Sequence, residues 1–508
     1  WIAPFDFCFG EHCLAAFRRW LKTQYDGIAA LNAAWGTDFA TWDEVVPDTT
    51  EEARSRARRT GRAAYGAWAD HRTFMEITYA DYFDGARRVM VEKEGELPFD
   101  MSGTQPPNGW TGMDMWRMAK VIDFPAVYDT ENVGEIIRSF GRPLVHPWYG
   151  YRLSGPYGAY RVWYDAFRYL NFGISFYSGI NILRPDYTIP PQVRQLTDAL
   201  ADLRAGGARL LRTLDHDVET LIHYSQPSIH AAQIEDRYAD FLAARDTWCR
   251  RLVASGRQFR FVASAELEDG ALDCTRASAV ILPHSAALSD GEVRALTRFA
   301  ARGGVIVGDR LTGTMDEHCR ARTGNPLAGT MRTSFDFGPE SRDGVRVFRY
   351  RSREGLIGTY YGFARELDAK GGFAATRRVD FPHPSVVYDL REHRCLGRVS
   401  SFETHLAPGA ATFYAVLPYE VKSLSVGADF SLTLSSKDGS PSGFHPVKVE
   451  VFDADGTRIH SDMTETRSGR GRWRPSLPRD IGARPRQVVF TDFISNLSCV
   501  RTIDGQDL

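Results

Sequence analysis

Apolar residues near the start of the chain recur with a helical period. Between residues 13 and 31 they stand three or four positions apart, at Leu14, Phe17, Leu21, Tyr25, Ile28 and Leu31. This spacing places side chains on one face of an α-helix. The stretch 53–91 is charged and Ala-rich and has an apolar stripe of its own, so it is also predicted to be helical.

The pattern then changes to short extended runs that end in Gly, Asn, Pro or aromatic residues. We predict strands at 97–102, 121–128, 143–148 and 173–177. The segments between them are long enough for crossover helices, which gives four β–α units. Four such units are typical of the second half of a (β/α)8 TIM barrel, and we assign residues 1–195 to it.

Half a barrel does not close a core, so the other half is expected upstream of residue 1. The first residues, Trp-Ile-Ala-Pro-Phe-Asp, include no initiator Met, no basic segment and no apolar signal-peptide core. We therefore expect the sequence to begin inside a longer protein, within its barrel.

Residues 196–330 alternate between strand and helix patterns. An amphipathic helix at 193–214 leads into this region. Strands are predicted at 218–224, 259–262, 279–283 and 304–309, and helices at 238–255 and 290–302. Alternation of this kind predicts a doubly wound parallel sheet.

Beyond Phe335 the helical period disappears. The runs at 345–350, 386–390, 411–417, 447–452 and 487–493 are alternating or β-branched, with Gly, Pro and Asp-Gly turns between them. We predict two β-sandwich-like domains, a small one at 335–420 and a C-terminal one at 421–508.

Composition limits the partners. The 508 residues suggest roughly three or four domains. Lys and Arg total 62 against 64 Asp and Glu, so the net charge of −2 favours neither nucleic acid nor an anionic membrane as a partner. No apolar run approaches the roughly 20 residues that span a bilayer. The sequence assigns no compartment.

Metal and cofactor motifs are missing from the sequence. Of seven cysteines only Cys8 and Cys13 are close together, and their spacing is not that of a zinc site. Arg302-Gly-Gly is neither a GxGxxG nor a P-loop pattern. A glutamine amidotransferase is disfavoured because the doubly wound region has no Cys on a Gly-flanked elbow. We predict no metal and no cofactor.

Several segments resemble a known family. Phe17-Arg-Arg-Trp-Leu-Lys and Ala30-Leu-Asn-Ala-Ala-Trp-Gly-Thr-Asp-Phe are similar to the segment after the acid/base strand of glycoside hydrolase family 42 β-galactosidases, in clan A. Val280-Ile-Leu-Pro and Arg302-Gly-Gly-Val-Ile-Val resemble that family's flavodoxin-like trimerisation domain. Val387-Tyr-Asp-Leu-Arg and Tyr414-Ala-Val-Leu-Pro-Tyr fit the small β domains that follow. The resemblance implies an oligo- or polysaccharide substrate and a homotrimer.

The resemblance also implies a retaining mechanism with two carboxyl groups about 5 to 5.5 Å apart. The acid/base Glu should end the fourth strand, upstream of residue 1, and the nucleophile the seventh. The predicted seventh strand, Pro143-Leu-Val-His-Pro-Trp-Tyr-Gly-Tyr, contains no Glu. The nearest catalytic candidates are Asp129 and Glu131, after the sixth strand. Alternatively, Glu131 caps or precedes the next helix, where an acidic first turn stabilises the helix dipole.

Candidates for substrate binding lie at the predicted strand ends. Rings there can stack on sugar C–H faces, and polar groups can bind hydroxyls. They are Gln105, Trp148, Tyr149, Tyr151 and Asp186. For Gln105 a turn is slightly favoured, and an Asp in the position of Asp186 more often forms a turn, whereas Trp148 is equally compatible with the core. Asp100 is a weaker carboxylate candidate.

Two functions remain open. The first is a glycosidase that hydrolyses β-galactosides or related glycans. The second is a catalytically degenerate barrel that binds carbohydrate without hydrolysis, suggested by the missing Glu after the seventh strand. We favour the enzyme, although a resemblance of fold is an analogy for function.

Overall fold

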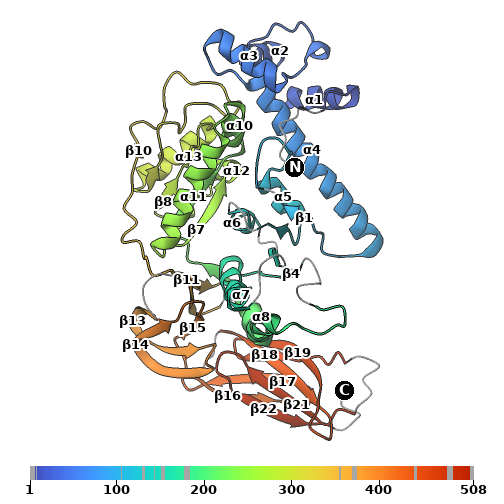
Figure 1. The fold of residues 1–508 in the computed structure, drawn as a ribbon, viewed down its shortest axis with the longest axis vertical. Helices are drawn as coiled ribbons and strands as arrows, with labels where there is room; N and C mark the ends of the chain where they lie inside the picture. The colour runs from blue at the N-terminus through green and yellow to red at the C-terminus, as the bar shows by residue number, and fades with distance from the viewer. Residues whose placement is uncertain are drawn as a thin grey trace. The chain divides into compact units, whose positions relative to one another are not determined.

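The computed structural model describes residues 6, 8–104, 106–128, 132–141, 144–149, 155–176, 183–353, 356–368, 374–439, 443–477 and 484–503. The chain divides into two compact units, and Figure 1 traces it through both. The first comprises residues 1–148, 218–252 and 259–338, and the second comprises 149–217, 253–258 and 339–508. In the described part of the chain, no helix is both long enough and apolar enough to cross a bilayer.

The first unit begins with helices. They are α1 (Glu11–Gln24), α2 (Ile28–Trp35), the 3-10 turn η1 (Trp42–Glu44), α3 (Thr50–Thr60) and α4 (Gly66–Glu94). The single helix predicted over 13–31 is wrong, because the chain turns at Gly27 with φ 103°, which residues with a side chain rarely adopt. Phe17 and Leu31 nevertheless share one core with Trp35, so the apolar period continues across the break.

Short parallel strands follow α4. They are β1 (Ser102–Thr104), β2 (Ala126–Val127) and β3 (His146–Tyr149), with α5 (Met115–Val121) and α6 (Val133–Ser139) as crossovers. β2 pairs with both β1 and β3. The strands are shorter than predicted: of the stretch 121–128, only Ala126 and Val127 are paired. Parallel neighbours joined by helices are the local topology of a (β/α)8 barrel.

The rest of the first unit is built on a five-stranded parallel sheet in the order β10-β9-β8-β6-β7. Its strands are β6 (Thr220–Tyr224), β7 (Phe259–Ala263), β8 (Ala279–Ile281), β9 (Val305–Val307) and β10 (Met331–Arg332). Numbered along the chain this order is 2-1-3-4-5, that of doubly wound flavodoxin-type sheets.

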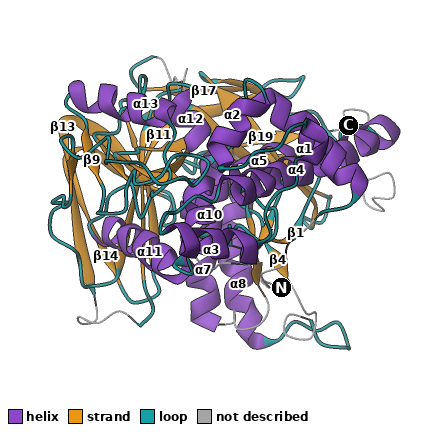
Figure 2. Cartoon of the chain, turned by 90° about the horizontal axis from the view of Figure 1, so that it is seen from above, coloured by secondary structure: helices purple, strands orange, loops and turns teal. Residues whose placement is uncertain are grey.

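Helices cover both faces of this sheet. They are α10 (Gln226–Ile234), α11 (Tyr238–Ala254), α12 (Ser264–Glu268) and α13 (Asp290–Ala301). Figure 2 shows α11 and α13 on opposite sides of the strands. Leu221 and Val280 of the sheet share one core with Leu296 and Phe299 of α13, which explains why the strand sequences are continuously apolar.

The second unit contains α7 (Gly155–Tyr169), β4 (Ser175–Phe176), α8 (Pro191–Asp202), the π-helical turn η3 (Leu203–Gly207) and α9 (Ala208–Leu211). A single helix over 193–214 was predicted. Instead, the helix is interrupted at Gly206, whose φ is 147°, and residues 214–216 form strand β5 (Leu214–His216). Residues 196–217 thus lie in the second unit, while the five-stranded sheet lies in the first.

Two antiparallel sheets complete the second unit. A six-stranded sheet has the order β14-β13-β15-β12-β11-β5, with β11 (Val345–Ser352), β12 (Thr359–Arg365), β13 (Ala375–Asp389), β14 (Arg394–Leu406) and β15 (Ala411–Leu417). A seven-stranded sheet has the order β16-β17-β20-β19-β18-β21-β22. Its strands are β16 (Val421–Val426), β17 (Ser431–Ser436), β18 (Phe444–Phe452), β19 (Arg458–Arg467), β20 (Arg470–Arg472), β21 (Gln487–Asp492) and β22 (Ser498–Thr502).

Candidate functional site

Most of the residues predicted to act on substrate fall outside the description of the structure. Asp129, Glu131, Gln105 and Tyr151 lie outside the described residues. Trp148 and Tyr149 are backbone members of β3, and their side chains are outside the description.

Asp186 is described, and its carboxylate is used within its own turn. Oδ1 accepts hydrogen bonds from the backbone N–H of Thr188 at 3.0 Å and from the Thr188 hydroxyl at 2.6 Å. These two bonds hold the pKa of Asp186 below its usual value. The geometry is that of an Asx turn on an exposed loop.

The surroundings of Glu131 bear on its alternative role as a helix cap. The N-cap of α6 is Asn132, which adopts a left-handed φ of 60°, and the first turn already contains Glu135. Asn132 Nδ2 donates to Asp246 Oδ1 on α11 at 2.6 Å. Glu131 directly precedes this N-cap in the sequence, and its own structure lies outside the described residues.

The weaker candidate Asp100 lies at the wrong end of its strand for catalysis. β1 begins at Ser102, so Asp100 precedes the strand. Its Oδ1 accepts a hydrogen bond from the N–H of Ala126, the first residue of β2, and lies 3.6 Å from Nε2 of His146, the first residue of β3. Residues at the amino ends of barrel strands contribute to stability, whereas catalytic residues lie at the carboxyl ends.

A buried polar network that sequence reasoning missed joins α4 to α10. Glu76 Oε1 accepts from Nε2 of His230 at 2.7 Å and from Nε2 of Gln226 at 2.6 Å. Gln226 in turn accepts from the hydroxyl of Tyr224 at 2.9 Å. Glu76 and His230 are 154 positions apart, so no local pattern could have paired them.

Glu76, Gln226 and Tyr224 of this network line a polar pocket of about 400 Å³ in the first unit. The lining residues come from α4, α5 and the carboxyl ends of β6 and β7, the edge at which doubly wound sheets bind ligands. Its carboxyl groups are those of Glu76, Asp114, Glu268, Glu292 and Glu317.

Two of these carboxyl groups have shifted pKa values. Burial and the nearby Glu76 raise the pKa of Asp114 to about 6, against the opposing effect of Arg117. Burial also raises the pKa of Glu317. Asp114 can therefore exchange a proton near neutral pH.

Asp70 ties the helices of the first unit to the loop after β9. Its Oδ2 accepts from Tyr25 at 2.5 Å and from the indole N–H of Trp35 at 2.8 Å, and its Oδ1 lies 2.6 Å from Nδ1 of His318. Burial alone would lower the pKa of His318, but Asp70 and neighbouring carboxylates reverse the shift and raise it. The cluster is an ion-paired clamp.

No group of three or more His, Cys, Asp or Glu side chains is arranged to hold a metal ion among the residues that the structure describes. Cys8 and Cys13 are both described as free thiols.

Comparison with known proteins identifies what the chain resembles. Residues 3–131 match the sequence profile of glycoside hydrolase family 42, described as β-galactosidase. The β-galactosidase bgaB of Geobacillus kaustophilus is 22% identical over 364 residues, covering 62% of this chain and 51% of that protein. BgaA of a Planococcus strain is 29% identical over 126 residues, which are 23% of this chain and 17% of that one.

Solved structures agree in fold. A β-galactosidase from Bacillus circulans sp. alkalophilus has a TM-score of 0.60 at 13% identity, covering 81% of this chain and 78% of that one. An exo-carrageenase of family 42 from Bacteroides ovatus has a TM-score of 0.57 at 11% identity, covering 82% and 64%. The predicted resemblance to family 42 β-galactosidases is confirmed, and the fold comprises a TIM-barrel domain with further sheet domains. The chain spans about half the length of the curated bgaB relative.

Proposed function

We propose that this chain forms part of a glycoside hydrolase that acts on β-galactosides or related glycans. The observation that carries the proposal is the match of residues 3–131 to the family 42 β-galactosidase profile. The agreement in fold with a solved β-galactosidase over 81% of the chain supports it. The parallel strands β1, β2 and β3 supply the kind of scaffold on which such sites are built.

The reaction proposed is a double displacement that uses two carboxyl groups. One protonates the leaving oxygen, and the acid/base Glu that does so is expected upstream of residue 1. The other attacks the anomeric carbon, and Asp129 and Glu131 are the proposed nucleophiles. β2 ends at Val127, so both follow its carboxyl end within four residues.

Strand order supports the choice of this loop. Since β1, β2 and β3 are parallel, the segments after each of them leave from the same edge of the sheet. Gln105 follows β1 directly, and Trp148 and Tyr149 end β3. We propose these three residues and Tyr151 as substrate contacts. Asp186 is a weaker proposal, because Thr188 already occupies its carboxylate.

A homotrimer assembled through the doubly wound domain is a further part of the proposal. It rests on the resemblance of that segment to the family's trimerisation domain and on the 2-1-3-4-5 strand order. Sedimentation analysis of the complete protein tests it: a species of three chains supports the trimer, and a monomer refutes it.

The activity is tested by hydrolysis of a panel of nitrophenyl glycosides by the complete protein, with Glu131→Gln and Asp129→Asn variants. Loss of the catalytic carboxylate should lower kcat by at least about 1000-fold. Glu96→Gln is the matched control, since Glu96 is exposed and precedes β1 at the opposite end of the strands. Sugar binding with no hydrolysis of any glycoside would overturn the proposal.

A further inference from the structure

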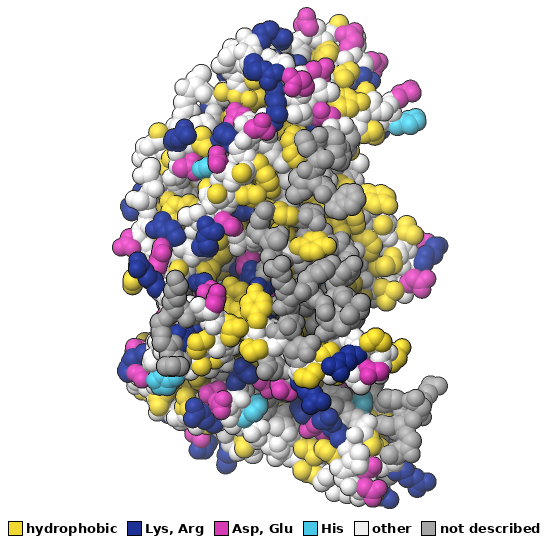
Figure 3. Space-filling view, viewed as in Figure 1, with side chains coloured by type: hydrophobic (Ala, Val, Ile, Leu, Met, Phe, Trp, Pro, Cys, Tyr) yellow, Lys and Arg dark blue, Asp and Glu magenta, His cyan; other side chains and the backbone are white. Residues whose placement is uncertain are grey.

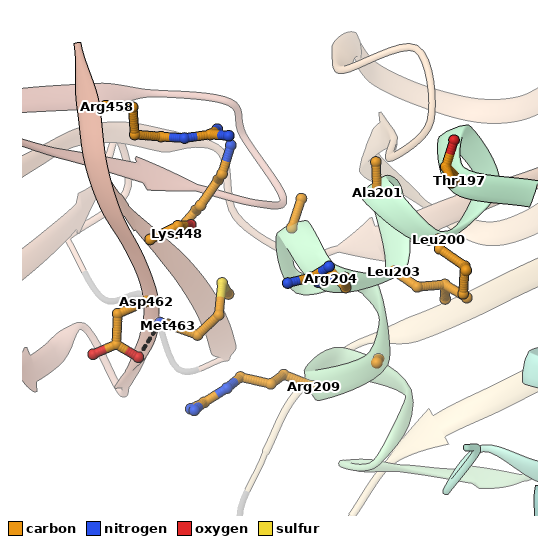
Figure 4. Close-up of a pocket in the computed structure, with 13 residues that line it drawn as sticks. Thr197, Leu200, Ala201, Leu203, Arg204, Arg209, Lys448, Arg458, Asp462 and Met463 are labelled. Atoms are coloured by element: carbon orange, nitrogen blue, oxygen red, sulfur yellow. Dashed lines mark hydrogen bonds between the residues drawn. The ribbon is translucent and has the colours of Figure 1, made fainter. Parts of the chain in front are cut away.

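The second unit contains a cleft of about 640 Å³ between the helical segment α8–η3–α9 and the strands β18 and β19 (Figure 4). This size is within the range of roughly 300 to 1,000 Å³ typical of small-molecule sites. The residues that line it come from α8, η3 and α9 on one side and from β18 and β19 on the other.

The charge of the lining is strongly one-sided. Arg204 and Arg209 extend from the helical segment towards the strands, and Lys448 and Arg458 come together on the strand side (Figure 4). Lys and Arg side chains gather over this part of the surface in Figure 3. Asp462 is the one acidic residue among those that line the cleft.

Existing ion pairs neutralise these cations only in part. Lys448 and Arg458 share the single carboxylate of Glu450, at 2.8 and 2.7 Å. Arg209 pairs with Glu465 at 3.1 Å. Within the described residues Arg204 has no ion pair, and its side chain is exposed. A positive charge is therefore left over at the mouth of the cleft.

Asp462 does not compensate for this charge by pairing with the cations. Its Oδ1 accepts from the backbone N–H of Met463 at 2.7 Å, and its Oδ2 accepts from the indole N–H of Trp473 at 2.8 Å. Both carboxylate oxygens of Asp462 are therefore used by Met463 and Trp473 rather than by the cations that line the cleft.

The remaining lining suits a sugar ring that carries the anion. Leu200, Leu203 and Met463 give the cleft an apolar wall against which C–H groups can pack, while the hydroxyls of Thr197 and Ser461 can bind sugar hydroxyls. Mixed walls of this kind fit a saccharide better than a free inorganic ion.

The two arginines of the helical segment are held by a fixed backbone. Gly206 has φ 147°, and a Cβ there would lie 2.6 Å from Cβ of Phe493. The irregular turn is thus packed directly against the C-terminal sheet, and Leu203 beside it belongs to the same core as Phe493. A rigid turn lowers the conformational entropy lost when Arg204 and Arg209 bind a ligand.

We propose that this cleft binds an anionic group, a sulfate ester or a carboxylate, carried by a saccharide. A guanidinium can donate two parallel hydrogen bonds to two oxygens of either group, the planar carboxylate or the tetrahedral sulfate ester, and three arginines line the cleft. The saccharide part of the proposal rests on the proposed glycosidase function. The anion part rests on the cleft alone.

The test is equilibrium binding of the complete protein to a neutral galactan, a sulfated galactan and a polygalacturonate, at low and high NaCl. At least one anionic polymer should bind ten-fold or more tightly than the neutral one. Preference for the sulfated polymer assigns the sulfate ester, preference for the polyuronate assigns the carboxylate, and tight binding of both assigns a general anion site. Equal affinity for all three overturns the proposal.

Variants locate the binding. Arg204→Gln should weaken anionic binding by about ten-fold, and Arg204→Gln with Arg209→Gln should abolish the preference. Arg204→Lys should bind the anionic polymer more tightly than Arg204→Gln but less tightly than the parent, because lysine keeps the positive charge and lacks the paired N–H donors of the guanidinium. Arg212→Gln is the control, since Arg212 is exposed, follows α9 and does not line the cleft. Unchanged binding by the double variant, or equal loss by the control, overturns the assignment.

Hydrolysis of nitrophenyl galactosides, measured on the same samples, separates the two proposals. The double variant should retain the parent's rate on these neutral substrates. Anionic binding without any hydrolysis in the parent would refute the glycosidase and leave the cleft assignment standing. Hydrolysis without preferential anionic binding would refute the cleft assignment and leave the glycosidase proposal standing.

Discussion

Glu76 and His230 form a buried pair, with Oε1 of the glutamate 2.7 Å from Nε2 of the histidine. Glu76 lies in the middle of α4, the helix before the barrel strands, and His230 lies in α10, beside the doubly wound sheet. Both side chains are almost completely buried. The pair is therefore a specific link inside the first unit.

Removing Glu76 should destabilise the first unit. Glu76→Ala would leave Nε2 of His230 without its acceptor and remove one of the two acceptors of the Gln226 amide. Breaking a buried pair in this way costs about 3 kcal/mol or more. Glu76→Gln keeps an acceptor oxygen and should lower the free energy of unfolding by less than Glu76→Ala does. Thermal unfolding of the complete protein measures the difference. Glu92→Ala, on the exposed side of the same helix, is the control, and an equal loss in that variant would contradict the account.

The Asp70–His318 clamp predicts a stability that depends on pH. The folded-state pKa of His318 is raised, so its contribution is complete below pH 6.5, the ordinary value, and is lost as pH rises through the folded-state pKa. The melting temperature of the parent should exceed that of His318→Gln most at acidic pH, with the gap closing towards alkaline pH. A gap that is constant from pH 5 to 9 would refute the clamp.

Asp114 predicts a second pH-dependent contribution to stability, at lower pH. Its pKa of about 6 lies above the ordinary 3.8, so the folded protein binds this proton more tightly and loses stability as pH rises across that interval. Asparagine has no proton to lose and can still cap the backbone N–H of Trp116. The melting temperature of Asp114→Asn, relative to the parent, should rise between pH 4 and 6.5 and then level off. Asp81→Asn, an exposed change on α4, is the comparison.

The packing around Gly206 predicts that adding a single methyl group there will strongly lower the free energy of unfolding. Gly206→Ala would place Cβ against Phe493 and require a φ of 147° that L-residues avoid, so a loss of about 2 kcal/mol or more is expected. Gly303→Ala is a matched control, since Gly303 has φ 92° and open space around its Cβ position. It carries backbone strain without the clash. Equal shifts in the unfolding midpoint of the two variants would show that contact with Phe493 contributes nothing.

Local patterns predicted the elements whose folding depends on their own sequence. The strand predicted at 411–417 coincides with β15, and the helix at 290–302 differs from α13 by one residue. β13 is different: only 386–390 was predicted, yet the strand begins at Ala375. Its first part contains Pro382 and Pro384 and is mostly exposed, so pairing with β14 is what extends it.

The site was harder to predict, for two physical reasons. Buried links such as Glu76 to His230 depend on tertiary proximity, which no periodicity reveals. Strand ends are also poorly defined by sequence, and the shift of β1 to Ser102 moved Asp100 from a presumed catalytic edge to the opposite end. Gly206 was visible in the sequence, but its effect on the helix over 193–214 depends on its packing against Phe493.

The most direct test of the central claim is to trap the glycosyl-enzyme intermediate. The complete protein would be treated with a 2-deoxy-2-fluoro galactosyl fluoride, digested with trypsin, and analysed by mass spectrometry. Cleavage after Lys120 and Arg138 releases one peptide that contains both Asp129 and Glu131. The account predicts a covalent sugar on one of these two carboxylates. A label on any other carboxylate, or activity without any label, would contradict it.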